Sequence, residues 1–105
     1  AEHAKTNLYH VALFADFIEK LRLTPDGDGS LLEHSLLFFG SGMGNGNRHE
    51  GNPLPLVAVG AAEGKGGRHI VCPEGTPLAN LWLGLANTFG RPMDSFGDSA
   101  GELEL

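Results

Sequence analysis

Apolar residues recur at three- and four-residue steps in two stretches, one near each end of the chain. The first stretch, residues 7–23, has the spacing of an amphipathic helix, which Pro25 would end. The second stretch, residues 77–89, follows a possible capping residue, Thr76, and is closed by Gly90. The sequence therefore predicts two apolar helices, the second with an inward face made of Leu78, Leu81, Trp82, Leu85 and Phe89.

Three short apolar runs lie between these helices, at residues 35–39, 54–59 and 69–72. The first two are continuous and closed by a glycine, which is typical of strands covered on both faces in parallel sheets. We therefore expect an α/β fold with mostly parallel buried strands and two apolar helices, in a single domain or a fragment spanning residues 1–105. Such a sheet has too few strands to be stable alone, so we expect the remainder of a parent chain, or another subunit, to lie along its edge.

Composition narrows the class of protein. With 41% hydrophobic and 19% charged residues, the chain of 105 residues is expected to fold. The net charge of −6 and the scattered basic residues argue against nucleic acid as a partner. No uninterrupted apolar run is long enough to span a membrane. The single cysteine, Cys72, cannot form an internal disulfide, and we expect it to be a buried structural thiol.

The segment richest in chemistry is the loop of residues 40–53, which leaves the end of the first predicted strand. In open α/β sheets, ligands bind at such strand ends. The glycines do not have the spacing of a dinucleotide or phosphate loop, so they indicate tight turns or close approach to a ligand. The polar side chains of the loop suit a metal and an oxyanion: Ser41, Asn45, Asn47, Arg48, His49 and Glu50. In the alternative interpretation, the asparagines and glycines only form turns and the charged side chains are solvated.

Other titratable residues have weaker patterns. His69, at the start of the third predicted strand, is a further candidate for the same cleft. The aspartates of residues 26–29 are expected to form a turn rather than a calcium loop, because Leu31 stands where an EF-hand requires glycine. No activated nucleophile is identified. The remaining histidines and two late aspartates are expected to have no special role: His3, His10, His34, Asp94 and Asp98.

Five segments of the chain resemble, in the same order, the C-terminal portion of an uncharacterised bacterial family that is defined by an HXXSHH motif. That motif itself does not occur in this chain. The family in turn resembles the alkaline phosphatases and sulfatases. The matching segments are DGDGSLLEHS (26–35), FGSGMGNGNRH (39–49), GGRH (66–69), EGTPLANL (74–81) and DSFGDS (94–99).

The resemblance implies the C-terminal portion of a three-layer α/β/α sandwich in a periplasmic or secreted protein, although the first residues lack the pattern of a secretion signal. It also implies a metal-dependent hydrolase of phosphate or sulfate esters, which uses zinc, manganese, iron or calcium. Residues 49–55 resemble the element that carries a late metal ligand in this superfamily, so the resemblance makes His49 a metal ligand and Asn45 a second one. Substrate would be bound by Ser41, Asn47, Arg48 and His69.

The chain departs from the superfamily after the first predicted strand, where Ser41 and Gly42 stand near the position of an Asp-His pair. A nucleophile is likewise expected to lie outside these residues. A second interpretation therefore stays open. In it, the chain belongs to a non-catalytic relative of the same fold, which binds carbohydrate or protein.

Overall fold

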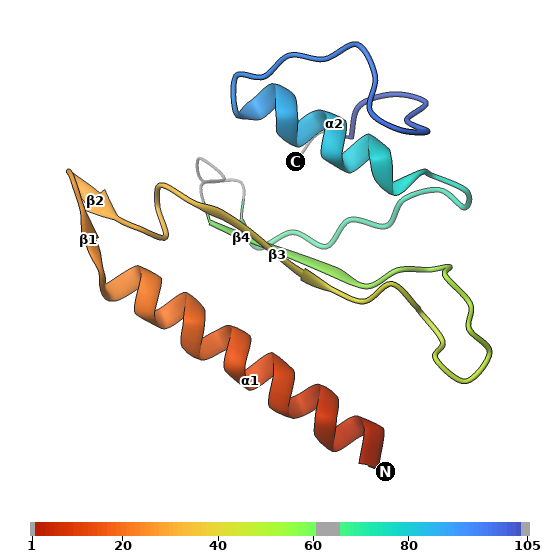
Figure 1. Ribbon diagram of the computed structural model, residues 1–105, viewed down its shortest axis with the longest axis horizontal. Helices are drawn as coiled ribbons and strands as arrows, with labels where there is room; N and C mark the ends of the chain where they lie inside the picture. Colours follow the sequence, from red (N-terminus) through yellow and green to blue (C-terminus); the bar gives the residue numbers. More distant parts are fainter. Residues whose placement is uncertain (1, 61–65, 104–105) are drawn as a thin grey trace. The chain divides into compact units, whose positions relative to one another are not determined.

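The chain divides into two compact units, residues 1–63 and 64–105. The computed structural model describes residues 2–60 and 66–103 (Figure 1). The first unit contains helix α1 (Glu2–Leu23) and two small sheets, and the second contains helix α2 (Leu78–Thr88). Within the described residues, neither helix is long and apolar enough to cross a membrane.

Helix α1 confirms the predicted first helix and begins several residues earlier than the sequence indicates. Its end is closed by Thr24, whose hydroxyl donates a hydrogen bond of 2.7 Å to the carbonyl of Lys20. None of its 22 residues is buried. The half-buried positions lie on one side of the helix, three or four residues apart, which is the face expected of an amphipathic helix: Phe14, Ile18 and Leu21.

Strands β3 (Leu36–Gly40) and β4 (Leu56–Gly60) coincide closely with the first two predicted strands. They pair with each other in antiparallel orientation, with Leu36 opposite Gly60 and Gly40 opposite Leu56. The expected α/β/α sandwich with mostly parallel buried strands is therefore wrong. Strands β1 (Pro25–Asp26) and β2 (Gly29–Ser30) are also antiparallel, so no strand pair in the described residues is parallel.

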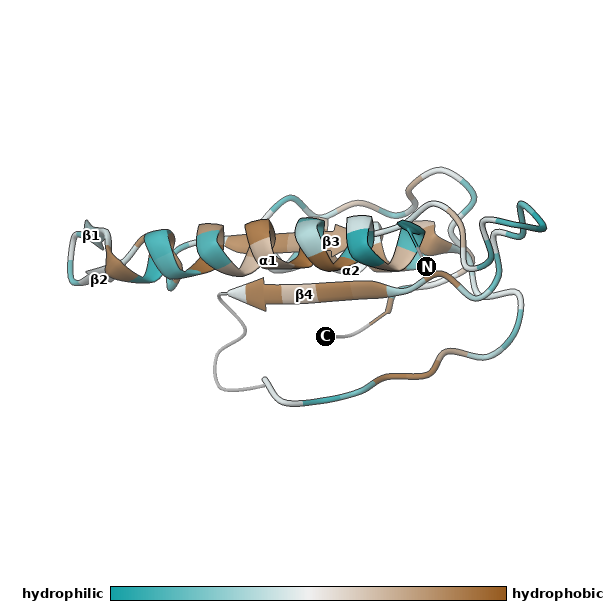
Figure 2. Ribbon diagram, turned by 90° about the horizontal axis from the view of Figure 1, so that it is seen from below, coloured by the Kyte–Doolittle hydropathy of each residue, from teal (hydrophilic) through white to brown (hydrophobic). Residues whose placement is uncertain are grey.

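The connection between β3 and β4 explains the antiparallel pairing. Parallel neighbours need a crossover, usually a helix, on one face of the sheet. Residues 41–55 contain no helix, and the chain folds back on itself there through a bridge between Asn45 and Glu50. A continuous apolar run therefore predicted the strands but carried no information on their direction. Strand β4 is hydrophobic along most of its length (Figure 2).

Strands β1 and β2 form a short hairpin between α1 and β3. Pro25 is opposite Ser30, and Asp26 is opposite Gly29. Gly27 has a φ of 59°, a left-handed conformation that glycine adopts without steric cost. The hairpin confirms the turn that the sequence predicts for residues 26–29.

Helix α2 confirms the predicted last helix, although its inward face differs in part. Leu81 and Leu85 are buried as expected, whereas Leu78 and Phe89 are exposed and Trp82 is half-buried. Pro77 precedes the helix in an extended conformation instead of occupying its first turn. The predicted strand at residues 69–72 is wrong, because this segment forms no strand. Its Cys72 is only partly buried.

The chain after α2 folds back onto the helix. The backbone amide of Leu103 donates a hydrogen bond of 3.0 Å to the carbonyl of Asn80, and the amide of Ala100 donates one of 2.8 Å to the Asn80 side chain. Gly84 lies against the carbonyl of Leu103, where a Cβ atom would not fit. The absence of a side chain at this buried helix position therefore permits the close approach of the C-terminal segment.

Candidate functional site

The polar loop of residues 41–55 is held closed by its own backbone. The amide of Ser41 donates to the carbonyl of Pro55 at 3.3 Å, and the amide of Gly44 donates to the carbonyl of Glu50 at 2.9 Å. Gly44 also packs so closely against the carbonyl of Pro53 that a Cβ atom there would clash. The two arms of the loop are therefore joined at its base and again near its tip.

Asn45 organises the tip of this loop. Its Oδ1 atom accepts hydrogen bonds from the backbone amides of Asn47, at 3.1 Å, and Arg48, at 3.2 Å. This is the turn that asparagine side chains commonly form with the following backbone. The side-chain oxygen that a metal would need is already engaged, so the arrangement favours a turn-forming role for Asn45 over the role of a ligand.

Three charged or titratable side chains follow one another at the tip: Arg48, His49 and Glu50. All three are exposed. The guanidinium of Arg48 lies 3.7 Å from the Glu50 carboxylate, an exposed contact that solvent screens strongly. His49 has a φ of 56°, a left-handed conformation that is uncommon for residues other than glycine. The closed turn fixes this conformation, and the site can therefore offer a guanidinium and an imidazole from adjacent positions.

The described residues do not form a complete metal centre. Among residues 2–60 and 66–103, no group of three or more His, Cys, Asp or Glu side chains could hold a metal ion. Within the loop, His49 is the only imidazole, and the oxygen of Asn45 is engaged by backbone amides. A metal at His49 would therefore need further ligands from outside the described residues, and the divalent metal stays a prediction.

The other predicted substrate-binding residues are placed differently. Ser41 lies at the base of the loop, where its hydroxyl accepts a hydrogen bond of 3.1 Å from the amide of Met43. Asn47 lies at the tip beside Arg48. His69 is exposed and belongs to the second compact unit, not to the unit that carries the loop. Asn47, Arg48 and His49 are thus consecutive residues at the tip of the loop, and the role of His69 stays a prediction.

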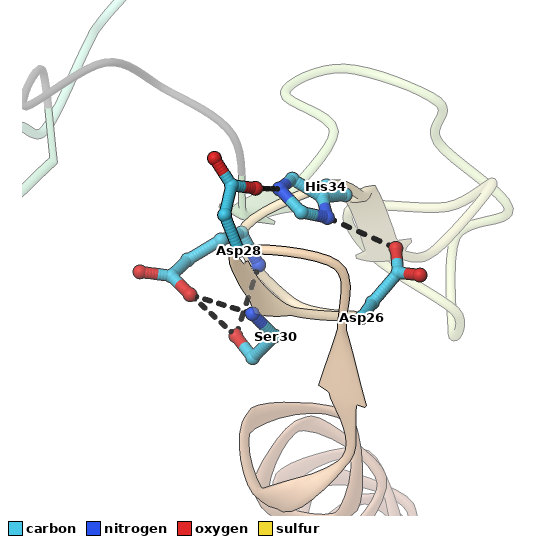
Figure 3. A network of polar contacts seen from close by, with 5 residues as sticks. Asp26, Asp28, Ser30 and His34 are labelled. Atoms are coloured by element: carbon cyan, nitrogen blue, oxygen red, sulfur yellow. Dashed lines mark hydrogen bonds and ion pairs between the residues drawn. The ribbon is translucent and has the colours of Figure 1, made fainter.

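A second polar cluster, at residues 26–34, was not expected from the sequence. The imidazole of His34 lies between two carboxylates, as Figure 3 shows. Its Nδ1 atom is 2.9 Å from Oδ2 of Asp26, and its Nε2 atom is 3.4 Å from Oδ1 of Asp28. The hydrogen bond with Asp26, together with the negative charges of Asp26 and Asp28, raises the pKa of His34.

Ser30 and Glu33 complete this cluster with three hydrogen bonds that run in both directions. Oε2 of Glu33 accepts from the backbone amide of Ser30 at 2.7 Å and from its hydroxyl at 2.9 Å. The Ser30 hydroxyl oxygen in turn accepts from the amide of Glu33 at 3.3 Å. The bonds from Ser30 lower the pKa of Glu33. The sequence Ser-x-x-Glu is the signal for such a capping box, and it was available at residues 30–33.

Comparisons with known proteins add no identification. No model of a protein family matches the chain. No curated protein and no solved structure is found to be similar to it. The resemblance to the HXXSHH family and to the alkaline phosphatases and sulfatases therefore stays a prediction.

Proposed function

We propose that the chain is the C-terminal segment of a metal-dependent hydrolase of phosphate or sulfate esters, to which it contributes the loop of residues 41–55. The sandwich fold is no part of this proposal. Besides the sequence resemblance, one observation supports it. The closed turn around Asn45 carries Arg48 and His49 at consecutive positions, and both residues are exposed.

In this proposal, Arg48 binds the ester anion. A guanidinium presents parallel N–H donors that match two oxygens of a phosphate or sulfate group. Its contact with Glu50 is long and exposed, so an anion can displace it at small cost. His49 is the metal ligand that the resemblance assigns to the loop. The nucleophile and the other metal ligands are assigned to residues outside the described part of the chain.

The test is a titration of the chain with inorganic phosphate and with sulfate, followed by NMR of backbone amides and arginine side chains. We expect shifts at Arg48 and at its neighbours Asn47 and His49. Arg48→Gln removes the guanidinium and should abolish them. Arg91→Gln, a change at an exposed arginine of the second unit, is the matched control and should leave them intact. Shifts that survive Arg48→Gln would exclude the loop as the anion site.

A second candidate function is supported by a different observation. Large apolar side chains of the first unit are exposed over α1 and β4, with Leu8 at 70%, Tyr9 at 62% and Val57 at 51%. Covering such side chains with another protein surface is favourable, because it removes apolar area from water. In this candidate, the chain is a non-catalytic protein-binding segment that packs against the remainder of a parent chain or another subunit. The periplasmic or secreted location is part of either candidate.

Self-association distinguishes the second candidate most simply. If apolar contacts drive association, the molar mass from light scattering should rise with chain concentration, and a double change of Leu8 and Val57 to lysine should suppress the rise. A double change of the exposed polar residues Lys5 and Asn47 to alanine is the control. A constant monomer mass together with no binding of an apolar dye would contradict an apolar docking surface.

A further inference from the structure

The connection between α1 and β3 is held by side chains as well as by backbone. Residues 24–35 form the β1–β2 hairpin and one tight turn, and the amide of Leu31 donates a hydrogen bond of 2.9 Å to the carbonyl of Thr24. The amide of His34 donates one of 3.2 Å to the carbonyl of Ser30. His34 thereby faces back over the hairpin, toward the carboxylates of Asp26 and Asp28 (Figure 3).

We propose that His34, held between Asp26 and Asp28, is a pH-sensitive clasp that fixes the connection between α1 and β3 while its imidazole is protonated. This inference does not rest on the proposed hydrolase function. It assigns a role to His34, for which the sequence indicated none, and adds one to the two aspartates of the predicted turn.

The two contacts require a proton on each ring nitrogen. An ionised carboxylate only accepts hydrogen bonds, and a neutral imidazole has one N–H group and one lone pair. With carboxylate oxygens near both Nδ1 and Nε2, the neutral ring would direct its lone pair at one of them. The imidazolium ion forms a hydrogen bond with Asp26 and an ion pair with Asp28. The arrangement is therefore complete only in the charged form, and loss of the proton removes one contact and replaces attraction by repulsion.

The surrounding charges all favour the imidazolium. Among the described residues, the charged groups that act on His34 are Asp26 of β1, Asp28 of the hairpin turn and Glu33 of the following turn. The ring also lies close to Gly29, where an added Cβ atom would be 3.5 Å from Cε1 of His34. That separation is an ordinary van der Waals contact, so the ring lies alongside the hairpin backbone at this position.

The pH window follows from the direction of the shift. The pKa of His34 is raised in the folded chain, first by the hydrogen bond with Asp26. A raised pKa means that the clasp is fully present below the ordinary histidine pKa of about 6.5. It is lost as pH rises through the higher pKa that His34 has in the folded chain. The capping box of Ser30 and Glu33 does not need this proton. Release of His34 should therefore loosen residues 24–35 without unfolding them.

The test combines NMR titration of the histidine rings with hydrogen exchange of backbone amides. Asp26→Asn should lower the pKa of His34, and Asp28→Asn should lower it by less, because that contact is longer and Asp28 is 98% exposed. Asp16→Asn, a change at an exposed aspartate of α1, should leave it unchanged. In the unchanged chain, the protection factors of the Leu31 and His34 amides should fall as pH rises through the pKa of His34.

His34→Gln separates the clasp from other effects of pH. Glutamine keeps one amide donor but cannot gain a proton, so the pH dependence of protection at Leu31 should disappear. His10→Gln, on α1, should preserve it. Both changes are at exposed positions, and circular dichroism verifies that the helices remain. The proposal would be overturned if hydrogen-exchange protection at Leu31 still depended on pH in His34→Gln. An unchanged pKa of His34 in both aspartate variants would overturn it as well.

Discussion

The phenyl rings of Phe14 in α1 and Phe39 in β3 stack with their centroids 4.9 Å apart and their planes 17° apart. This contact joins the helix to the β3–β4 sheet. Phe39 is directly opposite Val57 in the antiparallel register, and such cross-strand partners project from the same face of a sheet. Val57 is nevertheless 51% exposed. On this face, α1 therefore covers β3 better than it covers β4.

Replacing Phe14 by alanine should weaken the first unit. We expect the free energy of unfolding to fall by roughly 1–3 kcal/mol, below the roughly 3–5 kcal/mol typical of a fully buried ring, because Phe14 is only half-buried. Urea denaturation followed by circular dichroism measures the change. Phe17→Ala is the matched control, since Phe17 is 49% exposed on the same helix. An equal loss in both variants would mean that the stacked pair contributes nothing of its own.

The elements of the fold could be predicted from the sequence far better than their pairing. Both long helices and strands β3 and β4 follow from apolar spacing, from Pro25 and from the glycines that close the strands. Strand direction depends on how residues 41–55 return the chain, which rests on the Asn45–Glu50 bridge. Hydrophobic pattern carries no information on that bridge. The apolar run at residues 69–72 was too short to distinguish a strand from an extended loop.

The candidate sites, like the fold, could be predicted from the sequence only in part. Residue types identified the loop around Arg48 and His49, but not the turn that engages the side-chain oxygen of Asn45. His34 was assigned no role because it is eight residues from Asp26 in the chain, with no helical or strand spacing to relate them. The β1–β2 hairpin brings them together. Contacts that depend on the path of a tight turn are the ones that periodicity cannot predict.

Gly84→Ala should displace the C-terminal segment from α2. Alanine in a helix gains about 1 kcal/mol over glycine, but its Cβ would clash with the Leu103 carbonyl, and overpacking costs about 1–3 kcal/mol. The clash should win because it is with backbone. We expect faster hydrogen exchange at the amides of Leu103 and Ala100, both of which are bonded to Asn80. A more stable chain with both amides still protected would contradict this packing.

Asn45→Ala should loosen the tip of the loop, whereas Asn45→Asp should leave it nearly unchanged. Alanine removes the acceptor for the amides of Asn47 and Arg48, whereas aspartate keeps an oxygen in the same place. We expect faster hydrogen exchange at Gly44 and Glu50 in Asn45→Ala and near-normal exchange in Asn45→Asp. If both variants behave alike, the side chain does not hold the turn.

Manganese should locate the proposed metal-directed residue. Paramagnetic broadening in NMR spectra falls steeply with distance, so Mn²⁺ at low ratios should broaden the ring signals of His49 before those of the other four histidines, His3, His10, His34 and His69. His49→Gln should remove the effect from the loop. Because the described residues offer no three-ligand group, binding is expected to be weak, and chelator should restore the signals at once. Earliest broadening at a different histidine would refute the assignment of His49.

The capping box of Ser30 and Glu33 predicts a second dependence on pH, at the acidic end. The two hydrogen bonds from Ser30 lower the pKa of Glu33 in the folded chain. A lowered pKa means that the contribution of Glu33 to stability is present above the ordinary glutamate pKa of about 4.3 and is lost as pH falls through the lower pKa of the folded chain.

Ser30→Ala removes the hydroxyl donor, so carboxyl NMR should report a higher pKa for Glu33. Ser35→Ala, just beyond the turn, should leave the Glu33 pKa as it is. An unchanged pKa in Ser30→Ala would mean that the backbone amide of Ser30 alone holds the carboxylate.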